Sequence, residues 1–413
     1  MQVQIISRET IRPSSPTPPH KKIYNLSLFD LISPRVHIPI VYFYKSTTSS
    51  TVNISHLKIS LSKTLARYYP FAGRLNDGVS MECKDEGIVF IEATISSNLT
   101  EILENPKYET LDSLFPDGLR WKDWTGGSCL AIQVSFFNCG GLAIAMCMSH
   151  KLADANTICQ FFNTWAAMAR VPVGRDESTL PELNAASIFP RGNMPGISGS
   201  AKFEKGNNVS KRFVFEASKI ASLKAMVGEK VQTPTRVQVV TALIQKCAIS
   251  ASRRINTGTS NPSIMIQSVN LRSRMVPPVP ENCAGNMTWF FSIHTYDGRN
   301  QAINTFKRLR GEEGPLLIKE LLKESKRVFQ NENLVKYNYT SWCRFLFYEA
   351  DFGWGKPIWV TNGGCVFKDT VMMMDTRNGD GIEAFVNLEK EEMELFENDM
   401  KLLGFASLNP SVI

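Results

Sequence analysis

His150 and Asp154 are the residues whose types and spacing could do chemistry in this chain. They stand at the two ends of the stretch His-Lys-Leu-Ala-Asp. An imidazole takes up a proton near neutral pH, so His150 is a candidate general base. The spacing alone is a weak signal, because chance supplies such pairs often. A satisfied core histidine and an aspartate that caps a helix are the structural alternatives, and the second is strong because Asp is favoured at helix N-caps.

The elements around His150 place it between a strand and a helix. The apolar run of residues 142–148 predicts a buried strand. Apolar residues then recur at helical spacing, at Ile158, Phe161, Phe162, Trp165 and Met168. Strand ends and the loops after them often carry side chains that reach into a cleft, so His150 is well placed for a functional role.

The sequence offers no obvious protein nucleophile for His150. Ser149 and Cys147 share one face of the predicted strand, because successive side chains alternate, and that face is opposite to the face of His150. No Gly-x-Ser-x-Gly elbow surrounds a serine. We therefore expect His150 to take its proton from a bound substrate. A hydrolase or an acyl-enzyme transferase that uses Cys147 or Ser149 is disfavoured.

Other common site chemistries are missing from the sequence. Only five histidines occur and none is paired at ligand spacing with another, so no metal site is expected. The nine cysteines form no Cys-x-x-Cys pair, which favours buried, reduced thiols. Neither Gly-x-Gly-x-x-Gly nor a Walker pattern is present.

Length, composition and charge indicate a globular protein of two domains. The chain has 413 residues, of which 43% are hydrophobic and 21% charged. The net charge of +7 is spread along the chain, which favours an anionic small substrate and not a nucleic acid. No apolar run reaches the roughly 20 residues that cross a bilayer, and the first residues lack the pattern of a signal peptide. We expect a cytoplasmic protein with no membrane partner.

The predicted strands and helices are mixed without a regular repeat, which indicates an α/β or α+β fold. A polar stretch rich in Pro, Gly, Ser and Asn over residues 171–210 predicts a connection between domains. We place the domains at residues 1–190 and 211–413, with a linker at 191–210.

Periodicity and turn residues predict the individual elements. Thr235 is a candidate helix cap, and further helices are expected at residues 55–69, 217–227, 302–330 (with a break at 311–315) and 390–403. Strands are expected at 81–83 and 88–95 around a turn, and hairpins at 130–148 and 371–386.

The stretch Asp351-Phe352-Gly353-Trp354-Gly355 has an unusual composition. Two glycines around Trp354 imply a tight backbone path with a large ring packed against it. The favoured interpretation is structural, with Asp351 paired to an arginine and Trp354 in the core. Trp342 lies nearby, and its indole N–H could stabilise an oxyanion or could simply belong to the core.

Together these stretches resemble the plant BAHD acyl-CoA-dependent acyltransferases. The resemblance covers essentially the whole chain and rests on His150 to Asp154 followed by Asp351 to Gly355. Residues 11–18, 68–74 and 270–274 are similar to that family too. The segments 270–274 and 340–344 are most similar to the clade that acylates alkaloid-like and terpenoid acceptors.

The resemblance implies two chloramphenicol-acetyltransferase-like domains with a channel between them and His150 at its centre. Acyl-CoA would enter from one face and the acceptor from the other, and a segment after Gly355 would return to the first domain's sheet. A neutral His150 would take the proton of the acceptor as it attacks the thioester directly. Trp342 is our candidate for the oxyanion donor, with Thr340 beside it.

The resemblance also assigns supporting roles. Asp154 and Asp351 belong to the catalytic motifs, and Asp154 is implied to turn away and pair with an arginine. Arg272 is the first candidate for that arginine and Arg274 the second, while Asp351, Gly353, Trp354 and Gly355 are expected to be structural. A weaker similarity suggests that CoA contacts Thr235, Arg236 and Lys246, whose alternative is a helix start and a solvated face.

The expected function is transfer of an acyl group, with acetyl the expected group, from acyl-CoA to a hydroxyl of a specialised metabolite. Acylation of an amine stays open, as does a catalytically silent member that binds a ligand or protein. No bound cofactor or metal is expected, acyl-CoA would be a co-substrate, and the chain would act as a monomer.

Overall fold

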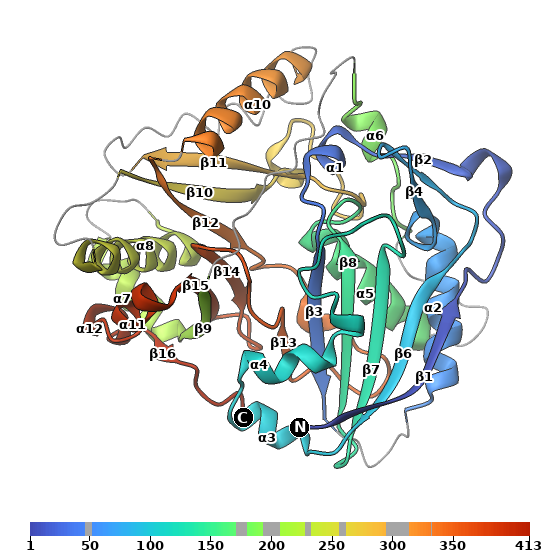
Figure 1. The fold of residues 1–413 in the computed structure, drawn as a ribbon, viewed down its shortest axis with the longest axis horizontal. Coiled ribbons are helices and arrows are strands. Elements are labelled where there is room, and N and C mark those ends of the chain that lie inside the picture. Colours follow the sequence, from blue (N-terminus) through green and yellow to red (C-terminus); the bar gives the residue numbers. More distant parts are fainter. Residues whose placement is uncertain are drawn as a thin grey trace.

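Two large sheets with helices packed against them form the body of the molecule (Figure 1). The computed structural model describes residues 1–45, 52–170, 180–192, 207–227, 233–255, 262–294, 314–331 and 333–413. The two ends of the chain lie near each other, at the bottom of the view in Figure 1. Most of the expected linker at 191–210 and of the expected break at 311–315 falls outside the described residues.

The first sheet carries His150 at the end of one of its central strands. In spatial order its strands are β1 (Val3–Ile11), β6 (Ile88–Ile95), β7 (Leu130–Phe137), β8 (Leu142–Ser149), β3 (His37–Tyr44) and β13 (Trp359–Thr361). The pair β6 and β7 is parallel, and the other neighbours are antiparallel. The last strand comes from late in the chain, after Gly355.

Two helices pack together against this sheet, namely α2 (Ile54–Arg67) and α5 (Ala155–Arg170). Tyr42 of β3 stacks on Phe162 of α5 with ring centroids 3.7 Å apart. All eight residues of β3 and of β8 are buried, which explains why both strands are nearly continuous apolar runs.

The second sheet is built from the later half of the chain. Its strands in spatial order are β11 (Thr288–His294), β10 (Ser263–Asn270), β12 (Val335–Ser341), β14 (Thr370–Asp375), β15 (Ile382–Glu389), β9 (Asn208–Phe215) and β16 (Ser407–Leu408). The helices that share its core are α7 (Ala217–Val227), α8 (Arg236–Ile255), α11 (Lys390–Phe396) and α12 (Met400–Leu403). A further helix, α10 (Gly314–Gln330), meets β11 through Phe329 and Phe290.

Short elements complete the description. A small sheet joins β2 (Ile23–Asn25), β5 (Ser80–Glu82) and β4 (Arg74–Asn76), and the short helices are α1 (Leu28–Ile32), α3 (Leu99–Glu104), α4 (Tyr108–Leu111) and α6 (Ala185–Ile188). The strands expected at 81–83 and 88–95 both exist, but they belong to different sheets and do not pair. The segment between them therefore joins two different sheets and does not close a hairpin.

Most predicted elements are confirmed, and the last helix is not. The hairpins β7–β8 and β14–β15 are present, as are the helices α2, α7 and α8. The single helix expected at 390–403 is two helices, because Asp399 accepts the backbone N–H groups of Lys401 and Leu402 and starts α12 anew. An N-cap inside an apolar periodic pattern is difficult to recognise from periodicity alone.

A buried polar contact joins the two sheets. Glu383 of β15 accepts hydrogen bonds from Arg212 of β9, at 3.1 Å, and from the indole of Trp359 in β13, at 3.2 Å. The guanidinium also lies over the Trp359 ring, 5.4 Å from its centroid. The Arg212 and Glu383 side chains are only 2% and 8% exposed, so either charge would be left without compensation if its partner were removed.

The substitution Glu383→Gln should therefore destabilise the protein strongly. It keeps the side-chain volume but leaves a buried cation at Arg212, which costs about 3–5 kcal/mol in comparable cases. The urea unfolding midpoint measures the effect. The matched control Glu82→Gln breaks the exposed pair with Lys84 and should leave the midpoint unchanged. Equal midpoints for the two variants would show that the buried contact does not stabilise the junction.

Candidate active site

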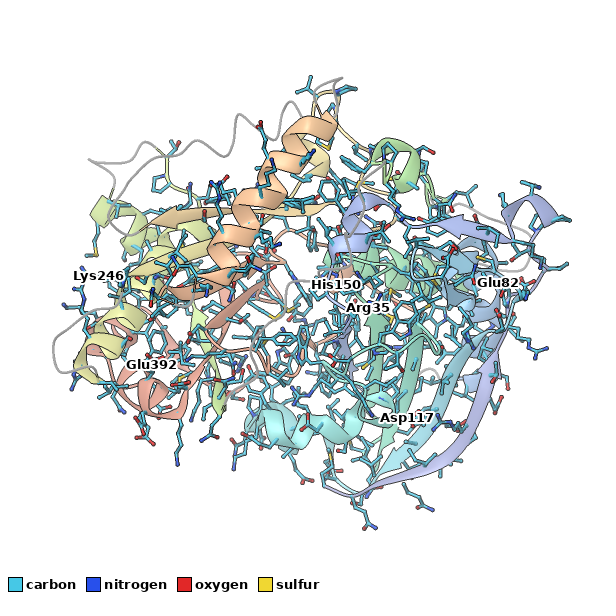
Figure 2. The ribbon with its side chains drawn as sticks, turned by 45° about the horizontal axis from the view of Figure 1, so that its top comes forward. Arg35, Glu82, Asp117, His150, Lys246 and Glu392 are labelled. Atoms are coloured by element: carbon cyan, nitrogen blue, oxygen red, sulfur yellow. The ribbon has the colours of Figure 1, made fainter. Side chains whose placement is uncertain are left out.

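His150 lies at the junction between the two sheets, directly after β8 and shortly before α5 (Figure 2). Its backbone N–H donates to the carbonyl of Val36 at 2.8 Å, which holds the turn against the first sheet. The side chain lines a cavity of about 660 Å³, which we call the His150 cavity. The strand-to-helix position expected from the sequence is confirmed.

Hydrogen bonds from Asn286 determine which nitrogen of His150 carries a proton. The two donor contacts of the Asn286 amide nitrogen go to Asp30 Oδ1, at 2.8 Å, and to the backbone carbonyl of His150, at 2.7 Å. Its oxygen lies 2.9 Å from His150 Nδ1 and can only accept. His150 Nδ1 therefore holds the proton, and the lone pair of Nε2 binds no donor among the described residues.

Asp30 holds Asn286 in position through hydrogen bonds. Its carboxylate accepts four hydrogen bonds, from the backbone and amide nitrogens of Asn286 and from the backbone and hydroxyl of Ser27. Burial raises the pKa of Asp30, and these four donors oppose that rise. Sequence reasoning missed both Asp30 and Asn286. The Ser-x-x-Asp pattern at residues 27–30 is a recognisable helix-start signal, but it predicts a capping box and no link to His150.

The environment of His150 favours the neutral imidazole. Burial lowers its pKa below the ordinary value of 6.5, and the nearby Asp154 and Asn286 oppose this only in part. A neutral ring with an unprotonated Nε2, on a residue that lines a cavity, has the form required of a general base at neutral pH.

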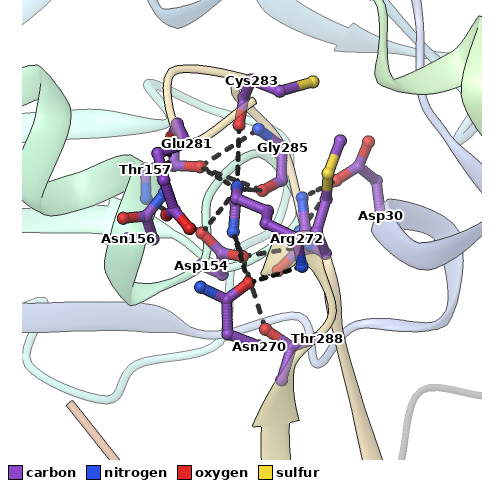
Figure 3. A network of polar contacts seen from close by, with 12 residues as sticks. Asp30, Asp154, Asn156, Thr157, Asn270, Arg272, Glu281, Cys283, Gly285 and Thr288 are labelled. Carbon is purple, nitrogen blue, oxygen red and sulfur yellow. Dashed lines mark hydrogen bonds and ion pairs between the residues drawn. The ribbon is translucent and has the colours of Figure 1, made fainter. Parts of the chain in front are cut away.

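Asp154 belongs to a buried network of polar contacts (Figure 3). It caps α5 by accepting the Thr157 backbone N–H at 2.9 Å, and it accepts Met287 N–H at 3.0 Å. Arg272 Nη1 donates to it at 2.7 Å, and the Arg272 side chain is fully buried. Both expectations, a helix cap and a pair with Arg272, are confirmed. Arg274 instead donates to the Asn270 carbonyl and is exposed.

Arg272 also binds backbone carbonyls of the second half of the chain. Its guanidinium donates to the carbonyls of Cys283 and Gly285 at 2.9 Å and 3.1 Å. Although burial would raise the pKa of Asp154, the Arg272 charge and its hydrogen bonds hold that pKa below the ordinary value. Asp154 is thus an ionised structural group.

The stretch from Asp351 to Gly355 forms a tight turn away from both cavities. Asp351 Oδ1 accepts the backbone N–H groups of Gly353 at 2.8 Å and Gly355 at 2.9 Å. Both glycines have positive φ, of 104° and 106°, so a side chain would strain the turn. Among the described residues no ion pair joins Asp351 to an arginine, and the turn's own amides bind one of its carboxylate oxygens, so the expected pairing with an arginine stays a prediction. Trp354 is only half-buried and stacks on Phe352, which is the buried ring.

A second cavity, of about 1590 Å³, adjoins the first, and we call it the basic cavity. Its described lining has two acidic residues, Glu281 and Asp399, against the basic residues Arg236, Lys246, Arg253, Arg254, Arg274, Arg344 and Lys401. The two cavities are neighbours, since six residues line both, namely Asn156, Ser268, Val269, Asn270, Ser341 and Phe345.

The three weak candidates for CoA contacts all line the basic cavity, but they are not equivalent. Thr235 caps α8, since its hydroxyl accepts Gln238 N–H. Arg236 is engaged with Asp375 at 3.0 Å and with the carbonyls of Gly379 and Gly381. Lys246 is exposed and lies at the opposite side of the molecule from the first sheet in Figure 2.

Trp342 and Thr340 line the His150 cavity, as the oxyanion hypothesis requires. Cys147 and Ser149 are fully buried in β8 and line neither cavity. Within the described part of the chain, no group of three or more His, Cys, Asp and Glu side chains could hold a metal ion. Nor does any helix in those ranges have the length and apolar character to cross a membrane.

Known proteins are similar to this chain in fold and in sequence. A Transferase family model matches residues 1–403. A 17,18-epoxy-17-hydroxycur-19-ene N-malonyltransferase of Strychnos nux-vomica is 38% identical, over 98% of this chain and 91% of that protein. A limonoid 21-O-acetyltransferase of Melia azedarach is 37% identical, over 100% of both chains. The crystal structure of vinorine synthase has 34% identity and a TM-score of 0.85, with 100% of both chains covered.

These similarities define an acyl-CoA-dependent acyltransferase with two chloramphenicol-acetyltransferase-like domains. The chain belongs to the Transferase family, the plant BAHD acyltransferases, as its motifs indicated. A more distant structure, of F. sporotrichioides TRI101 complexed with coenzyme A and T-2, shares the fold with a TM-score of 0.67 at 16% identity.

Substitution of Asn286 should remove the contact that fixes the proton of His150 on Nδ1. Asn286→Ala lacks the oxygen that accepts the Nδ1 hydrogen bond, and kcat should fall on the order of 10- to 100-fold because the ring is misplaced. The ¹⁵N chemical shifts of the ring should change from one tautomer, with the proton on Nδ1, to a mixture. An unchanged tautomer together with an unchanged kcat would exclude the positioning role.

Substitution of Asp154 should lower the stability of the folded protein. Asp154→Ala leaves Arg272 buried without a counter-charge and should lower the free energy of unfolding by about 3–5 kcal/mol. Since the folded pKa of Asp154 lies below 3.8, the loss should be present throughout pH 5–8, begin to shrink as the pH falls below the ordinary pKa of about 3.9, and continue to shrink down through the folded pKa. Denaturation at several pH values measures it. A constant difference down to pH 2 would contradict the ion-pair explanation.

Proposed function

We propose that this protein transfers an acyl group from acyl-CoA to a hydroxyl of a small apolar metabolite, with His150 as general base. The observation that carries the proposal is the unprotonated Nε2 of a neutral His150, a residue that lines a cavity sharing wall residues with a second, basic cavity. One cavity then suits the acceptor and the other the phosphates of CoA, so both reactants can meet at the histidine.

The proposed reaction needs no acyl-enzyme. His150 Nε2 takes the proton of the acceptor hydroxyl while its oxygen attacks the thioester carbonyl. The tetrahedral oxyanion that forms is stabilised by a donor in the His150 cavity, for which Trp342 is our first candidate and Thr340 the second. When the carbon–sulfur bond breaks, the CoA thiolate takes the proton from His150, which restores the neutral base.

Charge favours the basic cavity as the CoA site. CoA carries phosphate groups, and exposed cations such as Lys246, Arg253 and Arg254 would attract it from solution. We propose acetyl as the acyl group. The names of the relatives include both an acetyltransferase and a malonyltransferase, so malonyl-CoA is the first alternative donor to compare.

The lining of the His150 cavity favours a neutral acceptor. Eight aromatic residues contribute to its described wall, namely Trp121, Trp289, Phe290, Phe329, Tyr339, Trp342, Phe345 and Phe367. Among these described residues the one carboxylate is Asp154, whose charge is satisfied by Arg272, and an exposed Lys326 adds a positive charge. A protonated amine would lack a counter-ion there, so a neutral terpenoid-like alcohol, or an alkaloid alcohol whose nitrogen is uncharged, fits better.

The substitution His150→Ala tests the proposed base. It should lower transfer from acetyl-CoA to an alcohol library at least 10²-fold, while the circular dichroism spectrum stays unchanged. Release of the CoA thiol and product mass measure the transfer. His20→Ala, which changes an exposed histidine, is the control and should retain full activity. Turnover close to wild type in His150→Ala would refute the mechanism.

The pH dependence separates a hydroxyl from an amine as the acceptor. Because the pKa of His150 is lowered, kcat/KM for an alcohol should rise with pH through a value below 6.5 and then stay level to pH 9. For a matched amine, kcat/KM should keep rising toward the pKa of the amine itself. A higher plateau for the amine than for the alcohol would favour N-acylation, the reaction named for the Strychnos relative.

A further inference from the structure

A buried lysine next to His150 has no part in the proposed reaction. Lys151 follows His150 directly in the chain, is only 4% exposed, and lines neither cavity. Its ammonium group donates to the backbone carbonyl of Leu31 at 2.6 Å, and no carboxylate among the described residues forms an ion pair with it. An ammonium group without a carboxylate is unfavourable to bury, so its presence calls for a reason.

The effect of burial on Lys151 is seen in its protonation. Burial and the charge of Arg35 lower the pKa of the Lys151 ammonium group to about 8, and Asp30 opposes them only in part. Because this group would hold its proton more tightly in the unfolded chain, the charged form of Lys151 destabilises the fold at neutral pH. A residue whose only role is to stabilise the fold would have the opposite effect.

The carbonyl that Lys151 binds belongs to the helix that holds Asn286. Leu31 lies in α1 next to Asp30, and the last carbonyls of a helix lack partners within it and attract a positive charge. Asp30 accepts the backbone and amide N–H groups of Asn286, each at 2.8 Å. Asn286 in turn contacts Nδ1 of His150 at 2.9 Å. The contact of Lys151 with α1 therefore bears on the position of the imidazole.

These contacts close a ring of residues, linked in the order His150, Lys151, Leu31, Asp30 and Asn286. Two of the links are between neighbours in the chain, and the others are hydrogen bonds of side chains. The bond from Lys151 is the one hydrogen bond of this ring that does not involve Asn286. Linked hydrogen bonds support one another, so loss of this bond should loosen the hold of Asn286 on the imidazole.

We propose that Lys151 is a positioning residue for the base, which holds α1 against the turn at His150 and so keeps the Asn286 oxygen at Nδ1. The proposal rests on the proposed function, because it takes His150 as the base. Lys151 acts only through the other residues of the ring, since its Nζ is bound to Leu31 and its side chain lines neither cavity.

The first experiment compares Lys151→Met with Lys58→Met. Lys58 is a half-buried lysine of α2 that lines neither cavity, and its Nζ lies 2.7 Å from Glu9 Oε1. Methionine keeps most of the length of the side chain and removes its charge. The measurements are kcat and the KM for acetyl-CoA with the alcohol that the wild type acetylates fastest, the ¹⁵N chemical shifts of the His150 ring, and the Tm at pH 7.

The two variants should differ in every readout of the base. Lys151→Met should lower kcat about tenfold, leave the KM for acetyl-CoA unchanged and add the second tautomer to the ring spectrum. Its Tm should not fall, because a destabilising buried charge is lost. Lys58→Met should leave kcat and the ring spectrum unchanged. A wild-type kcat or ring spectrum in Lys151→Met would overturn the proposal. A lower Tm, or failure to fold, would also overturn it, since Lys151 would then be a structural residue.

A double-mutant cycle tests whether Lys151 acts through Asn286. If it does, Lys151→Met should cause no further loss of kcat once Asn286 is replaced by alanine, so the double variant should match Asn286→Ala. Losses of kcat that multiply would overturn the proposal. If the wild type transferred no acyl group, the proposed function would fail, and the ring spectrum of Lys151→Met would still test the link to His150 separately.

Discussion

The buried ion pair between Asp154 and Arg272 is the constraint on which the rest of the site depends. Two charges that are almost completely removed from water are tolerable only when every polar atom around them is satisfied. Arg272 achieves this by binding the carbonyls of Cys283 and Gly285, and Asp154 by binding Thr157 and Met287 N–H groups. The pair therefore fixes the segment 283–287 beside the start of α5.

That segment carries Asn286, and its position is what orients His150. Asn286 is held between Asp30, near the N-terminus of the chain, and the imidazole of His150. The base that we propose is thus assembled from three distant parts of the sequence. Asp30 and Asn286 set the tautomer, burial keeps the ring neutral, and Nε2 remains free for the acceptor. Asp154, which shares the sequence motif with His150, caps α5 and pairs with Arg272.

The sequence was informative where a property is local. The apolar run before His150, the helical face after it and the cap at Asp154 follow from the neighbouring residues, and the structure agrees with each. Arg272 was found only through the family resemblance, since spacing cannot bring residues 118 positions apart together. Asn286 and Asp30 were missed because their roles arise from tertiary contact. The spacing of residues 351–355 also gave no sign that the backbone N–H groups of this turn would bind the Asp351 carboxylate.

Direct transfer between two bound substrates distinguishes this mechanism from one that uses a protein nucleophile. Cys147 and Ser149 lie in the sheet interior, and burial raises the pKa of the Cys147 thiol well above its ordinary range. The decisive measurement is a rapid-quench experiment in which the protein is mixed with excess acetyl-CoA in the absence of an acceptor. Direct transfer predicts no burst of free CoA thiol and an unmodified protein mass. A burst equal to the protein concentration, with one acetyl group bound to the chain, would contradict it.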